Sequence, residues 1–131
     1  MKYILIMHCP KTGYETFGAM PKKDLQAHIA FMLDLNKSLR DSAELVSAEG
    51  LASPQQAKLV RAAKDGTPIT DGVFPESKEF LAGYWIVEVP SPERAYAIAA
   101  RASAAPGLGG AQMSIPIEVR QVMSGPPDEP L

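Results

Sequence analysis

The sequence is short of cysteine, of long apolar runs and of excess positive charge. Cys9 is the only cysteine among 131 residues, so no disulfide can form within the chain, and we expect a reducing, cytoplasmic location. The apolar stretch Tyr3–Met7 is too short for a membrane span or for the core of a signal peptide. The formal net charge is -2, and the 13 Lys and Arg residues are spread along the chain. The sequence therefore lacks the basic stripe that a protein binding nucleic acid directly would need.

The balance of residues is that of a soluble globular protein. Hydrophobic residues make up 46% of the chain and charged residues 21%, far from the composition of a disordered protein. A chain of this length suits one core, and we expect a single domain over residues 1–123. Residues 124–131 are rich in proline and contain few core-forming residues, so we expect a flexible tail.

The first part of the chain predicts a β-α-β unit. Lys2–His8 is apolar at nearly every position, which is typical of a strand that is covered on both faces. A helix is predicted from Pro21, as a first-turn residue, to about Arg40. Ala43–Ala48 alternates in polarity and predicts the second strand. The helix's apolar stripe consists of Leu25, Ile29, Met32, Leu35 and Leu39.

The second part predicts another such unit after an ambiguous segment. Residues 53–70 contain good helix formers, yet Asp65-Gly66 favours a tight hairpin turn, and periodicity leaves both interpretations open. Phe80–Val89 predicts a central strand, and a helix capped by Ser91 follows as far as Ser103. Ile115–Met123 predicts the last strand, which its proline places at an edge of the sheet. Two β-α-β units predict an α+β sandwich of the ferredoxin-like kind.

The segment Thr70–Val89 carries the most specific motif of the chain. It reads T-D-G-V-F-P-E-S-K-E-F-L-A-G-Y-W-I-V-E-V and resembles the signature of the DGPF, or YCII-related, family, although Val73 replaces the proline of that signature. The resemblance implies a dimeric α+β barrel and a hairpin formed by Lys58–Ala63 and Pro68–Thr70. The matching residues are Asp71, Gly72, Phe74, Glu76, Ser77, Lys78, Glu79, Gly83 and Glu88.

Alternation along Tyr84–Val89 predicts a ligand pocket. Tyr84 and Glu88 lie on the same face of that strand, and Arg120 on the last strand is a suitable bidentate partner for the carboxylate of Glu88. An ion pair exposed to solvent at the sheet edge is the alternative. His8, at the end of the first strand, is a further candidate for the pocket.

His28 and Asp71 are the candidates for acid–base catalysis. The family resemblance implies a His-Asp pair, but Asp41, the acid nearest the end of the first helix, does not have the expected spacing. Asp71-Gly72 is equally typical of a turn, and a lone histidine on an apolar stripe is more often a hydrogen-bonded core residue. The charged motif residues Glu76, Lys78 and Glu79 also suit a solvated helical turn. His8 and His28 lack the further ligands of a metal site.

Two classes of function remain open. The glycine-rich loop at 106–110 follows a helix, so it is not a dinucleotide-binding fingerprint, and no nucleophile motif is present. The first hypothesis is therefore an enzyme without a cofactor that transfers a proton on a small oxygenated or aromatic molecule. The second is a non-catalytic small-ligand or accessory protein associated with an alternative sigma factor, as the family resemblance implies.

The strands themselves favour a homodimer. Two helices cover only one face of a four-stranded sheet, yet Tyr3–Met7 and Trp85–Val89 are apolar on both faces, with Glu88 as the exception. A second copy packed on the open face would cover these side chains.

Overall fold

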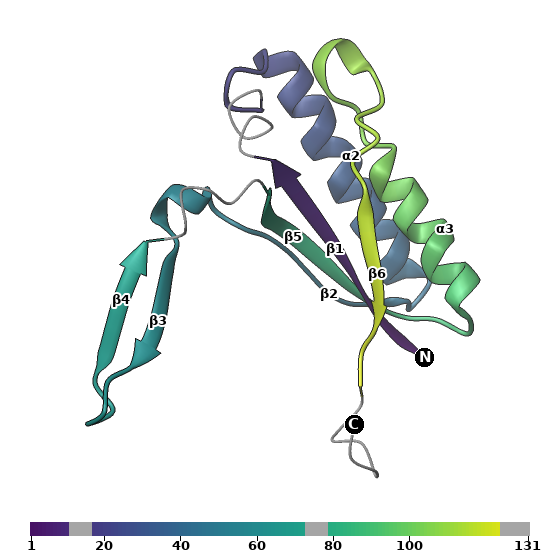
Figure 1. Cartoon of the computed structure of the whole chain (residues 1–131). Coiled ribbons are helices and arrows are strands. Elements are labelled where there is room, and N and C mark those ends of the chain that lie inside the picture. Colours follow the sequence, from purple (N-terminus) through teal and green to yellow (C-terminus); the bar gives the residue numbers. More distant parts are fainter. Residues whose placement is uncertain (11–16, 73–78, 124–131) are drawn as a thin grey trace.

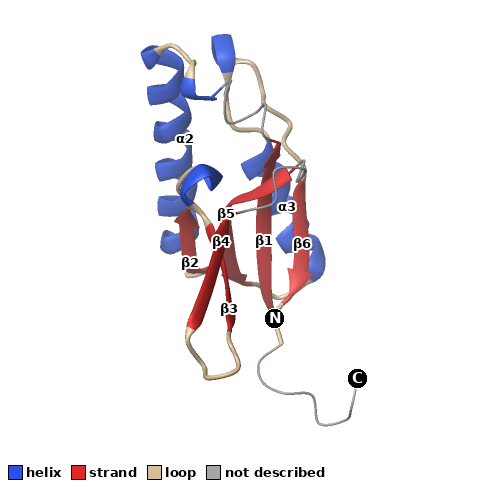
Figure 2. Cartoon of the chain, turned by 60° about the vertical axis from the view of Figure 1, so that its left-hand side comes forward, coloured by secondary structure: helices blue, strands red, loops and turns tan. Residues whose placement is uncertain are grey.

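The computed structural model describes residues 1–10, 17–72 and 79–123. Its centre is an antiparallel four-stranded sheet in the order β2-β5-β1-β6, and the helices α2 and α3 lie on the same face of it (Figure 1, Figure 2). This is the predicted ferredoxin-like α+β arrangement. The elements are β1 (Lys2–Pro10), α2 (Lys22–Asp41), β2 (Leu45–Gly50), β5 (Glu79–Glu88), α3 (Pro92–Ser103) and β6 (Ile117–Gln121).

The core lies between the sheet and the helices because every second strand residue points that way. Trp85 and Val87 of β5 are buried beside Leu5 of β1, as alternation predicted. The indole N–H of Trp85 is also hydrogen-bonded, since Nε1 donates to Asn36 Oδ1 at 2.8 Å. The core cluster comprises Tyr3, Leu5, Leu35, Leu39, Trp85, Val87, Val89, Ala95, Ile98, Ala99 and Ala102.

The helices follow the predicted ranges, with one error in the predicted stripe of α2. Leu35 and Leu39 are buried and Met32 packs against the core, as predicted. Ile29, however, is 47% exposed, because the core face of α2 passes through Phe31 instead. Pro21 is the N-cap of α2 rather than a residue of its first turn. The range of α3 is as predicted, and Ser91 Oγ accepts the backbone N–H of Arg94 at 3.3 Å.

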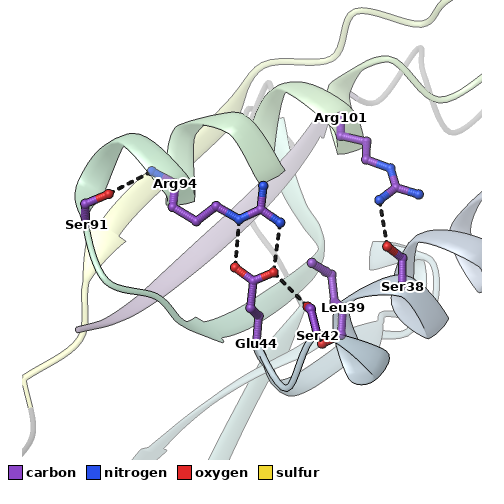
Figure 3. Close-up of polar contacts among 7 residues, drawn as sticks. All are labelled: Ser38, Leu39, Ser42, Glu44, Ser91, Arg94 and Arg101. Atoms are coloured by element: carbon purple, nitrogen blue, oxygen red, sulfur yellow. Dashed lines mark hydrogen bonds and ion pairs between the residues drawn. The ribbon is translucent and has the colours of Figure 1, made fainter.

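A bidentate ion pair joins the turn between α2 and β2 to the start of α3. Arg94 donates from Nε and Nη2 to the two carboxylate oxygens of Glu44, at 2.7 and 2.8 Å (Figure 3). Ser42 Oγ adds a third hydrogen bond to that carboxylate, and the bonds from Arg94 hold the pKa of Glu44 at about 2. Ala43, which lies between Ser42 and Glu44, has a φ of 60°, and this left-handed conformation ends α2.

Several strand boundaries differ from the predicted ones, and the last strand, predicted over Ile115–Met123, is limited to Ile117–Gln121. β2 begins at Leu45 because Ala43 belongs to the end of α2, and it runs on through Glu49 and Gly50. β1 continues to Pro10, with a bulge between Met7 and His8. Gly83 of β5 allows β2 to approach closely, since a Cβ there would lie 2.8 Å from the carbonyl oxygen of Glu49.

The ambiguous segment forms a hairpin of β3 (Lys58–Ala62) and β4 (Pro68–Gly72). The turn is at Asp65-Gly66, where Asp65 Oδ1 accepts the backbone N–H of Thr67 at 3.0 Å. Asp71 and Gly72 lie on β4 and pair with Leu59 and Lys58 of β3, so their interpretation as a turn was wrong. The hairpin projects away from the sheet on the side opposite the helices (Figure 1, Figure 2).

Within the described part of the chain, no helix is long and apolar enough to cross a membrane. β6 begins after Pro116 and lies at the sheet edge, as the proline predicted. The predicted tail, residues 124–131, lies outside the described residues.

Candidate functional site

The face of the sheet opposite the helices has an apolar centre. Ile4, Ile6, Tyr84 and Ile86 are half-buried there and lie opposite one another, since Ile6 pairs with Tyr84 and Ile4 with Ile86 across β1 and β5. We call this surface the open face. Its centre is apolar enough to hold the body of a small organic molecule, with the phenol of Tyr84 as a polar group.

Polar residues frame this centre on both flanking strands. On the β2 side, Ser47 pairs with Ile86 and Glu49 with Tyr84. On the β6 side, Arg120 pairs with Ile4 and Glu118 with Ile6. Directly paired residues point to the same side of a sheet, so two rows of side chains cross the open face. The rows are Glu49–Tyr84–Ile6–Glu118 and Ser47–Ile86–Ile4–Arg120.

Glu118 links two of the predicted pocket residues. Its Oε1 lies 3.4 Å from His8 Nε2, and its Oε2 lies 3.6 Å from Arg120 Nε. We call these residues the His8–Glu118–Arg120 cluster. A carboxylate beside an imidazole fixes the orientation of the ring and stabilises its protonated form, and a guanidinium stabilises negative charge on a ligand. The cluster has the groups needed to move a proton and to hold an anion.

Glu88 lies at the opposite end of the open face and does not contact Arg120. Its carboxylate is 3.2 Å from the N-terminal amine of Met1, and Lys2 is its cross-strand neighbour. The predicted pair of Glu88 with Arg120 was wrong because β1 lies between β5 and β6. Tyr84, His8 and Arg120 lie on one part of the face, and Glu88 lies at its edge.

His28 lies with the helices, away from the open face. Its Nδ1 is 3.1 Å from the carbonyl oxygen of Pro106, and because a carbonyl only accepts, Nδ1 carries the proton. The ring of Phe17 packs edge-on against the imidazole of His28, with 5.0 Å between the ring centroids. Asp24 accepts the backbone N–H of Gly109 at 3.0 Å, so two side chains of α2 hold this glycine-rich loop. Asp41 is paired with Lys37 at the other end of the helix.

Asp71 lies on the hairpin. Its carboxylate is 3.9 Å from Arg61 Nε, and the side chain is 64% exposed. The structure therefore does not bring the two proposed catalytic residues, His28 and Asp71, together. Of the other motif residues, Gly72 ends β4 and Glu79 begins β5. Phe74, Glu76, Ser77 and Lys78 lie outside the described residues.

Glu118 was missing from the predicted site, although the sequence contained a signal for it. Alternation along β6 placed Glu118 and Arg120 on one side of the strand, away from Ile117 and Val119. Alternation alone does not give the pairing of β6 with β1, and it is this pairing that places Glu118 beside His8, 110 positions away in the sequence.

Other polar groups of the described chain do not extend this site. No group of three or more His, Cys, Asp or Glu side chains in residues 1–10, 17–72 and 79–123 is placed to hold a metal ion. Burial raises the pKa of the Cys9 thiol, and the nearby charge of Glu79 adds to that effect, which disfavours a reactive thiolate. The carboxylate of the Glu44–Arg94 pair has a strongly shifted pKa, but the pair connects the turn after α2 to α3, so its role is structural.

Comparison with models of known protein families gives a match that covers most of the chain. The sequence model of the YCII-related domain matches residues 1–115. The matched range includes His8 and Tyr84 but ends before β6, so Glu118 and Arg120 lie beyond it. No curated protein matches the chain.

Proposed function

Because the chain belongs to the YCII-related domain family, we propose that it binds a small oxygenated or aromatic molecule on the open face and transfers a proton on it. The observation that carries this proposal is the contact of Glu118 with both His8 and Arg120, next to the apolar centre. We further propose that two copies of the chain pack with their open faces together and enclose the ligand. This chemistry needs no cofactor.

The proposed step moves one proton between the ligand and His8. Glu118 faces Nε2, so Nδ1 takes a proton from an acidic C–H or O–H of the ligand, and the electron pair of that bond stays on the ligand as an enolate or phenolate. Glu118 stabilises the imidazolium, and Arg120 stabilises the charge on the ligand. The proton then returns to the same atom or to a neighbouring one.

A second copy would strengthen these interactions. The side chains of His8 and Glu118 are 37% and 45% exposed in the single chain, so water screens their charges. Packing two open faces together would exclude that water and cover the half-buried isoleucines.

Isotope exchange tests the proton transfer. The probes are phenylpyruvate and 2,4-pentanedione in deuterated buffer, and the loss of their C–H signals is followed by NMR. We expect the wild-type chain to accelerate exchange, and we expect His8→Asn and Glu118→Gln to reduce the acceleration by about 100-fold or more.

Glu49→Gln is the matched control, because it makes the same change on the same row at the other side of the face. We expect it to retain the wild-type rate within a small factor. Equal exchange rates for wild type, His8→Asn and Glu118→Gln would contradict the assignment of the cluster.

The exposure of the cluster also favours a second candidate, a protein that binds the same class of molecule without catalysis. A regulatory role beside an alternative sigma factor belongs to this candidate. Benzoate and phenol serve as probes in thermal-shift and calorimetric titrations. Binding that depends on Arg120 and Tyr84, with no exchange on either C–H probe, would favour this candidate over the enzyme.

A further inference from the structure

The β3–β4 hairpin is the least buried part of the described chain. Every residue of β3 is exposed, including Leu59 and Val60 at 42% and 62%, and in β4 only Ile69 is half-buried. An isolated two-stranded hairpin is at best marginally stable in water, and an apolar surface of this kind is typical of an interaction site. The hairpin therefore needs a surface to pack on.

The two faces of the hairpin differ in charge. One face carries the Arg61–Asp71 ion pair, together with Leu59 and Ile69. The other face is uncharged beyond its first pair, Lys58 and Gly72. Its remaining pairs are Val60 with Thr70 and Ala62 with Pro68. We call these four residues the uncharged strip. Their small, uncharged side chains suit close contact with another apolar surface.

An apolar hollow lies at the base of the hairpin, between the segment that leads into β3 and the start of β5. The hollow has a volume of about 460 Å³ and is lined by residues 51–54, Gln56, Ala57, Phe80 and Leu81. Leu51 and Leu81 are 45% and 43% exposed. Since the hairpin projects on the side away from the helices (Figure 1), a second chain that packs on the open face approaches from the side on which the hairpin lies.

The area required by a stable interface favours joint use of both surfaces. Four strands about 4.8 Å apart and about five residues long present a flat area of roughly 300 Å², and the hairpin raises this to roughly 450 Å². A stable interface buries about 800 Å² of accessible surface on each partner, so the two surfaces together come closer to that requirement than the open face does. The open face alone is therefore small. A twofold dimer would use both surfaces of each copy and so double every contact, which a different protein on one copy would not do.

We propose that the hairpin is a dimerisation arm. Its uncharged strip packs on the second copy next to the open face, so each ligand pocket is bounded by residues of both chains. This inference rests on the dimer in the proposed function, and it adds the surface that makes the dimer stable. It makes the strip, rather than the charged face of the hairpin, the contact surface.

Matched substitutions on the two hairpin faces test the arm. Val60→Lys places a charge in the strip, and Leu59→Lys makes a similar change on the adjacent residue of the opposite face. Sedimentation at micromolar concentration measures the dimer dissociation constant. We expect Val60→Lys to raise it at least tenfold and Leu59→Lys to change it by less than about threefold. Circular dichroism checks that both variants are folded.

Ile86→Lys on the open face separates failure of the arm from failure of the dimer. A monomeric wild-type chain would overturn the dimer and the arm together. A dimer that Ile86→Lys dissociates and Val60→Lys does not would leave the dimer standing and overturn the arm. A stronger effect of Leu59→Lys than of Val60→Lys would overturn the assignment of the strip.

Cross-linking gives an independent test. A photoreactive benzoylphenylalanine replaces Val60 in an unlabelled chain, which is mixed with ¹⁵N-labelled chain, exchanged and irradiated. We expect cross-linked peptides that pair unlabelled with labelled sequence, and we expect few from the same probe at Leu59. Cross-links confined to single chains would contradict the arm.

Discussion

The two faces of the sheet are made by the same strands but have opposite chemistry. On the covered face, Leu5 and Val87 are fully buried, and no charged side chain is buried in the described chain. On the open face, Ile4 and Ile86 are only half-buried, and a histidine, an arginine and three glutamates lie around them. Neighbouring residues of one strand thus have different roles: one set stabilises the fold, and the other is available to a ligand or a second chain.

This difference between the two faces predicts which substitutions affect stability and which affect binding or assembly. Changes on the covered face and between the helices should affect the free energy of unfolding, because buried groups have no water to compensate them. Changes on the open face should affect binding and assembly and leave the fold of the chain intact.

Val87→Asp should have the largest effect. It places an unpaired carboxylate at a fully buried position, which costs several kcal/mol against a total stability of roughly 5–15 kcal/mol. We expect the chain to lose its cooperative thermal transition in circular dichroism.

Ile86→Asp is the control for that experiment, one residue away on the open face. We expect this variant to keep a native far-UV spectrum and a cooperative melt. If Val87→Asp melted like the wild type, or if both variants unfolded alike, the contrast between the faces would be refuted.

Glu44→Gln should have the next largest effect, about 1–2 kcal/mol at neutral pH, because it weakens charge-assisted hydrogen bonds from Arg94. The pKa of Glu44 is lowered from 4.5 to about 2 in the folded chain. The stability that this carboxylate contributes is therefore present above pH 4.5 and is lost as the pH falls toward 2.

The measurement is the difference in melting temperature between wild type and Glu44→Gln across that pH range. The difference should shrink as the pH falls. Asp41→Asn is the control, since its exposed pair with Lys37 should contribute at most about 0.5 kcal/mol. A difference for Glu44→Gln that is constant from pH 7 to 2 would contradict the role of its charge.

Ala43→Gly should stabilise the chain by about 0.5–1 kcal/mol, because glycine adopts the φ of 60° found here without steric cost. Ala30→Gly, within α2, is the reverse control and should destabilise it by about 1 kcal/mol. Urea unfolding measures both. Destabilisation by Ala43→Gly would show that this end of the helix is not under strain.

Glu118→Gln should have the smallest effect on stability, below about 0.5 kcal/mol, because its two ion pairs are exposed in the single chain. The same variant should greatly reduce the proposed proton transfer. Chemical unfolding at low protein concentration measures the first effect. A loss of several kcal/mol would mean that the open face contributes to the fold as the covered face does.

The elements were predictable from the sequence to a large extent, whereas the site was predictable only in part. Alternation sorted Tyr84 and Trp85 onto opposite faces correctly, and Ser91-Pro92 marked the start of α3. The same patterns misplaced the partner of Glu88 and put Ile29 on the core face of α2. Alternation says which side of its own strand a residue occupies, but not which strand lies beside it.

The sequence by itself determined the order of the strands and helices of the central sheet, the two faces of its strands and the family of the chain, because these depend on neighbouring residues and on a local motif. Tertiary structure alone decided that β1 lies between β5 and β6, which separates Glu88 from Arg120 and brings His8 to Glu118. It also decided that the hairpin stands apart, with no buried residue in either of its strands. Strand pairing depends on many weak contacts between segments that are distant in the sequence, so it cannot be predicted from a local pattern of residues.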